Sequence, residues 1–356
     1  MNKFGFVLHP LAAHDIARKY PLANYLPTSW LEGLLNRMPP QFVSQISDLR
    51  SDTGDTADGC FVGCPATSRQ LVEWPPERAY SRILQAIDLA ARWGAKIVGL
   101  GAFTAVAGDK GLTLAERASV GITTGNSYTV YTAIEGALQA AERMGLKVGE
   151  SRAAILGATG SIGRACALLL APQVGALSLV GRRPEALAQI AEEVVGEAGI
   201  TPEPFTDVQQ GLRDADIVLA VTSATEAIIG PDDVKPGAVV CDVARPRNVS
   251  RAVADQRADV LVIEGGAVAV PGEGFRFGFD FGFPPGLAYA CMAETMILAL
   301  EGRFEHYSVG PELRLDQVRE MGVLAKKHGF RLAGYRCFER TVSDEEIARK
   351  RALAGR

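Results

Sequence analysis

A glycine-rich turn in the middle of the chain is the first place where residue types and spacing indicate chemistry. Gly157, Gly160 and Gly163 follow the apolar run 153–156 and open the helical pattern 164–170. Glycines in such a turn let the backbone approach a pyrophosphate, and the N-terminus of the next helix offers unpaired N–H groups and a positive dipole end. The pattern predicts the strand, turn and helix of a dinucleotide-binding unit; an ordinary strand-to-helix turn is the alternative.

The end of the next expected strand bears on which dinucleotide binds. A site for NAD places Asp or Glu about twenty residues beyond the glycines, where it binds the ribose 2′-OH. Here the strand 177–180 leads instead to Arg182 and Arg183. A carboxylate repels a 2′-phosphate, whereas a guanidinium pairs with it through charge-assisted hydrogen bonds. We therefore expect NADPH as the cofactor, with two surface arginines at a strand-to-helix corner as the alternative.

Further strand ends at the same edge of the expected sheet add small or polar residues. Thr222 and Ser223 follow one strand, Asp242 ends the next, and Gly265 follows another. Loop chemistry without a ligand is the alternative at each. The expected cofactor contacts are Gly157, Thr159, Gly160, Ser161, Ile162, Gly163, Arg182, Arg183, Thr222, Ser223, Asp242 and Gly265.

Cys291 is the candidate nucleophile. It lies early in the helical pattern 286–300, just after Pro284 and Pro285. We expect it in the second turn of that helix, where the dipole still favours a thiolate. The alternative is a small buried thiol in a helix packing seam.

Segments in order over nearly the whole chain form a distinctive set: 4–7 with His9, 101–104, 123–126, 157–163, Tyr289–Met296 with Glu301 and Gly302, and 319–330. They resemble the cyanobacterial long-chain acyl-[acyl-carrier-protein] reductases. The resemblance implies NADPH-dependent reduction of a fatty acyl thioester to a fatty aldehyde through an enzyme thioester, and it assigns that thioester to Cys291. It also implies a fatty acyl carrier protein or acyl-CoA as substrate, and an aldehyde-consuming enzyme as a partner.

The oxyanion of such a reaction needs hydrogen-bond donors, because negative charge develops on the carbonyl oxygen. The candidates are Thr104, Thr124, Asn126 and Ser127. We expect Thr124 and Asn126 to act with Cys291. Simple capping of the helical pattern 128–144 by Asn126 or Ser127 is the alternative. His306 and His328 are the nearest histidines in number, and only folding decides whether either reaches the cysteine.

The segment 272–283 departs from the resemblance. In an extended chain its phenylalanines would point one way and line an acyl groove. A strand that packs its aromatic face on the core is the alternative. These residues are Phe275, Phe277, Phe279, Phe281 and Phe283.

Composition suits an ordinary two-domain protein: 356 residues, 47% hydrophobic, with a net charge of −4. The sequence contains no basic cluster of the kind that binds nucleic acid. No window approaches the roughly 20 apolar residues of a membrane span, and the N-terminal apolar run is too short for a signal peptide. The scattered cysteines indicate reduced thiols in a cytoplasmic protein. Cys60 and Cys64 lack a second ligand pair, so no metal site is expected.

The order of strands and helices predicts an α/β fold: a central Rossmann-type parallel sheet domain plus an α/β substrate lobe completed by C-terminal helices. We expect an N-terminal substrate lobe at 1–130, a linking helix at 131–150, an NADP-binding Rossmann domain at 151–270, and a C-terminal helical segment at 271–356 that carries Cys291. The active cleft is expected between the lobes.

Two rival functions stay open. A shikimate-dehydrogenase-like or glutamyl-tRNA-reductase-like NADP oxidoreductase also joins an α/β lobe to a Rossmann domain through a long helix, and 242–247 looks like a segment of the latter. In that case Cys291 is dispensable. The second rival is a catalytically silent NADPH-binding sensor that forms no aldehyde.

Overall fold

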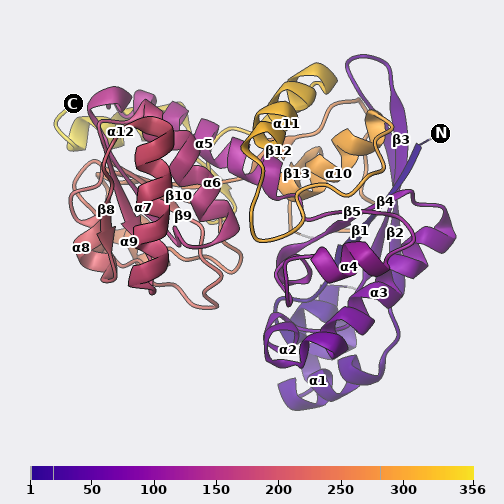
Figure 1. Cartoon of the computed structure of the whole chain (residues 1–356). Coiled ribbons are helices and arrows are strands. Elements are labelled where there is room, and N and C mark those ends of the chain that lie inside the picture. Colours follow the sequence, from indigo (N-terminus) through magenta and orange to yellow (C-terminus); the bar gives the residue numbers. More distant parts are fainter. Residues whose placement is uncertain (1, 19, 281) are drawn as a thin grey trace. The chain divides into compact units, whose positions relative to one another are not determined.

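The structure is a computed structural model that describes residues 2–18, 20–280 and 282–356. It divides into two compact units (Figure 1). Unit 1 contains Met1–Tyr128, Val268–Pro311 and Glu320–Arg331, and unit 2 contains Thr129–Ala267, Glu312–Arg319 and Leu332–Arg356. The segment 271–356 therefore contributes residues to both units.

Unit 1 is built around a mostly parallel sheet with the strand order β2-β3-β1-β4-β5. Only β2 is antiparallel to its neighbour among these described strands, so the carboxyl ends of β1, β3, β4 and β5 meet at one edge. Open α/β sheets bind ligands at such an edge. The strands are β1 (Asn2–Leu8), β2 (Gln41–Arg50), β3 (Thr56–Gly63), β4 (Ile97–Leu100) and β5 (Gly121–Thr123).

Helices α3 and α10 cover opposite faces of this sheet. A Cβ atom at Gly5 would contact Ala90 of α3, whereas one at Gly99 would contact Thr295 of α10. Gly5 pairs with Val98, the neighbour of Gly99, so the two glycines face opposite sides. The helices of unit 1 are α1 (Thr28–Arg37), α2 (Ser68–Glu73), α3 (Pro76–Trp93), α4 (Leu112–Arg117) and α10 (Ala290–Leu300), with the 3-10 helices η1 (Ala13–Arg18), η2 (Pro21–Tyr25) and η3 (Ala102–Thr104).

Unit 2 contains the expected parallel sheet, in the order β11-β10-β9-β6-β7-β8. Strands and helices alternate along the chain, and α6 and α7 pack beside each other on this sheet (Figure 1). This is the predicted Rossmann-type α/β arrangement. The strands are β6 (Arg152–Leu156), β7 (Ala176–Val180), β8 (Glu203–Phe205), β9 (Ile217–Ala220), β10 (Val239–Asp242) and β11 (Leu261–Glu264).

The helices of unit 2 supply the second layer of its core. They are α6 (Ser161–Leu170), α7 (Pro184–Ala198), α8 (Val208–Leu212), α9 (Arg251–Gln256) and α12 (Asp344–Leu353), with η4 (Val148–Glu150), η5 (Ala171–Gln173) and η6 (Pro231–Asp233). Helices α5 (Asn126–Arg143) and α11 (Leu315–His328) contribute residues to both units. Among the described residues, no helix combines the length and the apolar character needed to cross a bilayer.

Two helix starts differ from the sequence prediction, and both concern candidate site residues. Helix α5 begins at Asn126, two residues before the expected start. Helix α10 begins at Ala290 rather than near Gly286, because β13 (Leu287–Tyr289) precedes it. The prediction that Cys291 lies in the second turn is therefore wrong, and it lies in the first. The remaining short strands are β12 (Ala267–Ala269) and β14 (Arg331–Leu332), which form a sheet with β13, and β15 (Arg336–Cys337), which pairs with β16 (Arg340–Thr341).

The phenylalanine-rich segment is not a regular strand, although part of it packs as the core alternative expects. Phe275 and Phe277 are buried, and the ring of Phe277 stacks on Phe61 of β3 with centroids 5.2 Å apart. Between them, Arg276 exchanges backbone hydrogen bonds with Ser47. The groove hypothesis is therefore wrong for Phe275 and Phe277, whose rings are used in packing. Phe281 lies outside the described residues.

Candidate active site

Cys291 differs from every other cysteine of the chain in its exposure. It is the second residue of α10 and partly exposed, whereas the other five cysteines, all among the described residues, are buried. Burial raises the pKa of those five thiols, to about 12 for Cys60, Cys64 and Cys166. A thiolate is the reactive form of cysteine. Accessible thiol chemistry in the described structure therefore concentrates at Cys291.

The loop after β5 packs directly on this cysteine. Gly125 has a φ of +74°, and a Cβ atom there would lie 2.2 Å from Cys291 Cα and 2.3 Å from Cys291 Cβ. A side chain at this position would be strained and would collide with α10. Thr124 and Asn126 flank Gly125, so the structure brings the three predicted catalytic residues into one part of unit 1.

The polar residues of this loop do not all keep a donor for a substrate. The Thr124 hydroxyl is buried and donates to the Ser308 carbonyl. Ser127 is also buried; its N–H donates to Ser308 Oγ at 3.2 Å, and its own Oγ accepts from Ser308 Oγ at 2.6 Å. Outside this loop, in η3 after β4, the Thr104 hydroxyl donates to the Gly101 carbonyl at 2.8 Å.

Asn126 has a different environment. It is partly exposed and is the first residue of α5, where the backbone N–H points out of the helix. Asn126 therefore keeps an exposed position at the start of this helix, whereas the buried Thr124 hydroxyl supports the loop.

A buried carboxylate joins the same loop to α10, and the sequence prediction gave it no role. Glu294 is fully buried one helical turn after Cys291. Its carboxylate accepts from the Thr123 hydroxyl and, at 2.8 Å, from the Tyr128 N–H. Burial raises the pKa of Glu294, and these hydrogen bonds oppose the shift. The available signal was a single charged residue within an otherwise uncharged helix of 11 residues.

The histidines of unit 1 are engaged in other contacts. The Ile122 N–H donates to Nδ1 of the exposed His306 at 3.2 Å. His328 is buried and contacts Glu301, which lies just past the C-terminal end of α10, at 2.6 Å. Burial lowers the pKa of His9 to about 4, and its Nε2 accepts from the Phe103 N–H at 3.0 Å. His9 therefore holds the loop after β4 as a neutral imidazole.

The glycine turn of unit 2 has the geometry of a dinucleotide cradle. Gly157 has a φ of +93°, and a Cβ atom at Gly163 would lie 2.1 Å from the Gly157 carbonyl oxygen. Helix α6 begins at Ser161, directly after Gly160, so the N–H groups of its first turn lie beside this close backbone approach. A Cβ atom at Gly181, after β7, would contact Thr159. These residues fit a dinucleotide pyrophosphate and its ribose.

The other expected cofactor residues lie at the ends of neighbouring strands. Arg182 and Arg183 are exposed after β7. After β9, Ser223 is exposed, and the Thr222 N–H donates to Asn248 Oδ1 at 3.0 Å. Asn248 is fully buried and supports this strand end, although the sequence prediction did not name it.

Asp242 acts on its own loop. Burial raises the pKa of this carboxyl, which accepts from the Ala244 N–H at 3.1 Å and from the Val249 N–H at 2.9 Å. It therefore shapes the 243–249 loop rather than presenting a free carboxylate at the edge.

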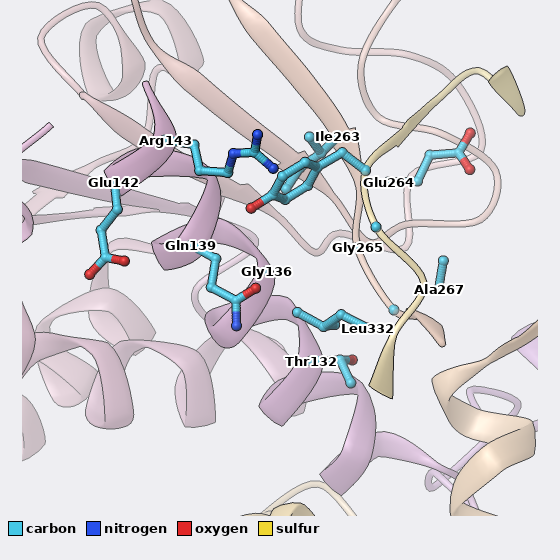
Figure 2. Close-up of a pocket in the computed structure, with 13 residues that line it drawn as sticks. Thr132, Gly136, Gln139, Glu142, Arg143, Ile263, Glu264, Gly265, Ala267 and Leu332 are labelled. Carbon is cyan, nitrogen blue, oxygen red and sulfur yellow. The ribbon is translucent and has the colours of Figure 1, made fainter. Parts of the chain in front are cut away.

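Gly265 borders a pocket of about 330 Å³ within unit 2 (Figure 2). One wall is a stripe of α5 that includes Thr132, Gly136 and Gln139, and the other walls come from 263–267 and 332–335. Figure 2 shows the Glu264 carboxylate pointing away from α5.

That carboxylate pairs with Arg247 at 2.8 Å and accepts from the Glu339 N–H at 2.8 Å. Burial raises its pKa, but the contact with Arg247 and the nearby charge of Arg245 outweigh that effect and lower it. Glu264 therefore holds the chain around Glu339 beside the edge of the sheet. Its carboxylate points away from the α5 wall of the pocket (Figure 2).

Comparison with known proteins finds one family model and several similar proteins. A family model for shikimate / quinate 5-dehydrogenases matches residues 139–264. The chain is 31% identical over 346 residues to the aminotransferase PigE of Serratia sp., covering 92% of this chain but only 39% of that protein's length. It is 28% identical over 352 residues to the long-chain acyl-[acyl-carrier-protein] reductase of Synechococcus elongatus, covering 92% of this chain and 98% of that one.

Among solved structures, quinate dehydrogenase from Corynebacterium glutamicum in complex with NAD matches 90% of this chain and 98% of its own, with 12% identity and a TM-score of 0.37. Glutamyl-tRNA reductase from Methanopyrus kandleri matches over 81% of this chain and 54% of its own, with 17% identity and a TM-score of 0.30.

The glycine cradle on a parallel sheet, the dehydrogenase family model and the similarity to a reductase place the chain among the NAD(P)-dependent oxidoreductases. The prediction of a nicotinamide cofactor is therefore confirmed for the class NAD(P).

Proposed function

We propose that the chain reduces a fatty acyl thioester to a fatty aldehyde with NADPH, through an acyl-enzyme on Cys291. The observation that carries this proposal is the setting of Cys291: a partly exposed thiol in the first turn of α10, packed against a glycine loop that leads into the N-terminus of α5. The similarity to the reductase of Synechococcus elongatus supports it.

The chemistry assigns a separate task to each part of the site. The Cys291 sulfur attacks the thioester carbonyl, a new carbon–sulfur bond forms, and the carrier thiol leaves with the proton that Cys291 gives up. The oxyanion of this step is held by donors at the start of α5, with Asn126 foremost. The glycine turn of unit 2 would hold NADPH, and the chemistry that this cofactor would supply is a hydride for the acyl carbon. Hydride addition would leave a tetrahedral alkoxide on the Cys291 sulfur. The carbon–sulfur bond would then break, releasing the aldehyde and a Cys291 thiolate that takes up one proton.

The substrate and partner follow from this proposal. The acyl group would arrive on an acyl carrier protein or on coenzyme A, because both present a thioester to the same sulfur. The aldehyde product is reactive, so an aldehyde-consuming enzyme is the proposed downstream partner.

Intact mass spectrometry tests the covalent step directly. The protein is incubated with palmitoyl-CoA and separately with palmitoyl carrier protein, in both cases without NADPH. We expect a palmitoyl adduct that hydroxylamine removes. We expect Cys291→Ala to form no adduct under these conditions, and no aldehyde in a second incubation that contains NADPH. Cys166→Ala is the matched control, because this thiol is buried in unit 2. Aldehyde formation by Cys291→Ala would favour a non-covalent oxidoreductase, and NADPH binding without aldehyde from either donor would favour a sensor.

A further inference from the structure

Glu294 is the one charged residue of α10, and the proposed acyl transfer does not use it. We propose that Glu294 is a positioning residue for acylation of Cys291. Its buried carboxylate fixes the 123–128 loop, and with it the donors at the start of α5, against the nucleophile. This role rests on the proposed function and adds to it the element that sets the distance between nucleophile and oxyanion donors.

The carboxylate holds both ends of the loop at once. One oxygen accepts from the Thr123 hydroxyl and the other from the Tyr128 N–H at 2.8 Å. The Thr123 oxygen in turn accepts from the Gly125 N–H at 3.1 Å. A chain of hydrogen bonds therefore runs from α10 to the glycine that touches Cys291.

The same contacts explain why α5 begins where it does. An α-helix leaves its first N–H groups without partners inside the helix, and a Ser, Asn or Asp side chain at the N-cap usually accepts from one of them. Gly125 precedes α5 and has no side chain. Instead, Ser308 Oγ accepts from the Ser127 N–H and Glu294 accepts from the Tyr128 N–H. Both acceptors come from other segments, so the first turn of α5 depends on them.

The N-terminus of α5 offsets part of the cost of burying a carboxylate at this position. The N-terminus of a helix of 18 residues carries a positive dipole end, which favours a negative charge beside its first turn. A fully buried carboxylate is costly unless its oxygens accept hydrogen bonds, and here both do. Burial of Glu294 is therefore favourable only while the 123–128 loop keeps the conformation that donates these hydrogen bonds.

The coupling reaches Cys291 because Glu294 and Cys291 lie three residues apart on one face of α10. Gly125 packs against the backbone of Cys291. If the hydrogen bonds to Glu294 are lost, the donors at Asn126 move relative to the sulfur. A displacement of about 1 Å in such a geometry can reduce a rate by about 10²-fold.

A pair of substitutions at Thr123 separates positioning from folding. Thr123→Val is nearly isosteric but removes the hydroxyl that links Glu294 to Gly125, whereas Thr123→Ser keeps it. We expect Thr123→Val to slow adduct formation from palmitoyl-CoA by about 30-fold or more, and Thr123→Ser to restore the rate to within about threefold. Alkylation of Cys291 by iodoacetamide needs no oxyanion donor, so it should change by less than about threefold in both variants.

Glu294→Gln gives an independent measurement. The amide keeps the shape of the side chain, but its NH₂ group faces a donor of the loop or of α5, so one of the two hydrogen bonds is lost. It should slow acylation like Thr123→Val, while leaving NADPH binding by unit 2 unchanged. Glu301→Gln is the matched control just past the end of the same helix and should acylate at the wild-type rate.

The outcomes are distinct. If Thr123→Val and Glu294→Gln are folded and acylate at the wild-type rate, Glu294 has no positioning role. If acylation and alkylation fall together, the role is general support of the fold, and the inference is wrong. If the wild-type protein forms no adduct at all, the proposed function fails first.

Discussion

The glycine turn of unit 2 and the glycine loop beside Cys291 both place a glycine with positive φ shortly before a helix N-terminus, but they complete that N-terminus in different ways. In unit 2 the cradle is made of backbone: Gly157 and Gly163 approach each other, and α6 starts at once. In unit 1 the first turn of α5 is completed by side chains from other segments, Ser308 and Glu294.

The difference corresponds to the tasks proposed for the two sites. A backbone cradle binds a pyrophosphate that every dinucleotide shares, so it needs close approach and little else. A nucleophile and its oxyanion donors must keep a fixed geometry while a bond forms. Side-chain contacts between distant segments can hold that geometry, and a change at any one of them can alter it.

The largest expected effect comes from filling the contact at Cys291. Gly125→Ala places a methyl group about 2.2 Å from Cys291 Cα at a positive φ. We expect aldehyde formation to fall by about 10²-fold or more, because the loop must move away from α10. Steady-state aldehyde assays measure this.

Gly33→Ala is the control for this experiment. Gly33 lies in α1, and a Cβ atom there would have no neighbour within 4 Å, so alanine should keep activity and stabilise the helix by up to about 1 kcal/mol. Full activity in folded Gly125→Ala would show that the contact with Cys291 does not matter for catalysis.

A matched pair in unit 2 tests the backbone cradle. A methyl group at Gly163 would lie 2.1 Å from the Gly157 carbonyl oxygen, whereas Gly196 in α7 has open space around it. Gly163→Ala should weaken NADPH binding by about 30-fold, as measured by fluorescence titration, and Gly196→Ala should leave it unchanged. Acylation of Cys291 without NADPH should survive in both variants. If Gly163→Ala blocks acylation as strongly as reduction, the two sites are not separable in this way.

This contrast also explains what the sequence could predict. The glycines at 157, 160 and 163 follow a buried strand and precede a helix, so the local pattern contains almost all of the cradle. Cys291 could be named because its neighbours in sequence are distinctive.

Glu294 and Ser308 could not be assigned, because their partners lie more than 160 residues away in sequence. The same long-range contacts moved the start of α5 to Asn126. The catalytic role predicted for Thr124 stays a prediction, and no local pattern shows that its hydroxyl donates to the Ser308 carbonyl.

A smaller effect is expected at the exposed arginines after β7. Replacing Arg182 by Asp and Arg183 by Ala should weaken NADPH binding by about tenfold and improve NADH binding, because a carboxylate repels the 2′-phosphate and accepts from the ribose hydroxyl. Dissociation constants for both nucleotides measure this change. An unchanged ratio of the two constants would leave the arginines as surface residues, while the cradle itself could still bind either cofactor.

The smallest effect compares two carboxylates of the same region. Burial opposes ionisation of Glu301, but contacts with Lys327 and His328 outweigh it and lower the pKa of this carboxyl. A carboxyl with a lowered pKa in the folded state stabilises the protein above its ordinary pKa, and this contribution is lost as the pH falls through the lowered value. Glu301→Gln should therefore reduce the free energy of unfolding by about 1 kcal/mol at neutral pH, and the difference should shrink in acid.

Glu294 should show the opposite sign. Burial raises its pKa, and its contacts with Thr123 and Tyr128 only oppose that shift. A carboxyl with a raised pKa stabilises the folded state most below its ordinary pKa, and this contribution is lost as the pH rises through the raised value. Urea unfolding of the wild type, Glu294→Gln and Glu301→Gln at several acidic pH values measures how the free energy of unfolding of each variant depends on pH. Parallel pH dependence in the two variants would mean that Glu294 is held as Glu301 is, by nearby cations, and not by the neutral donors of the loop and the first turn of α5.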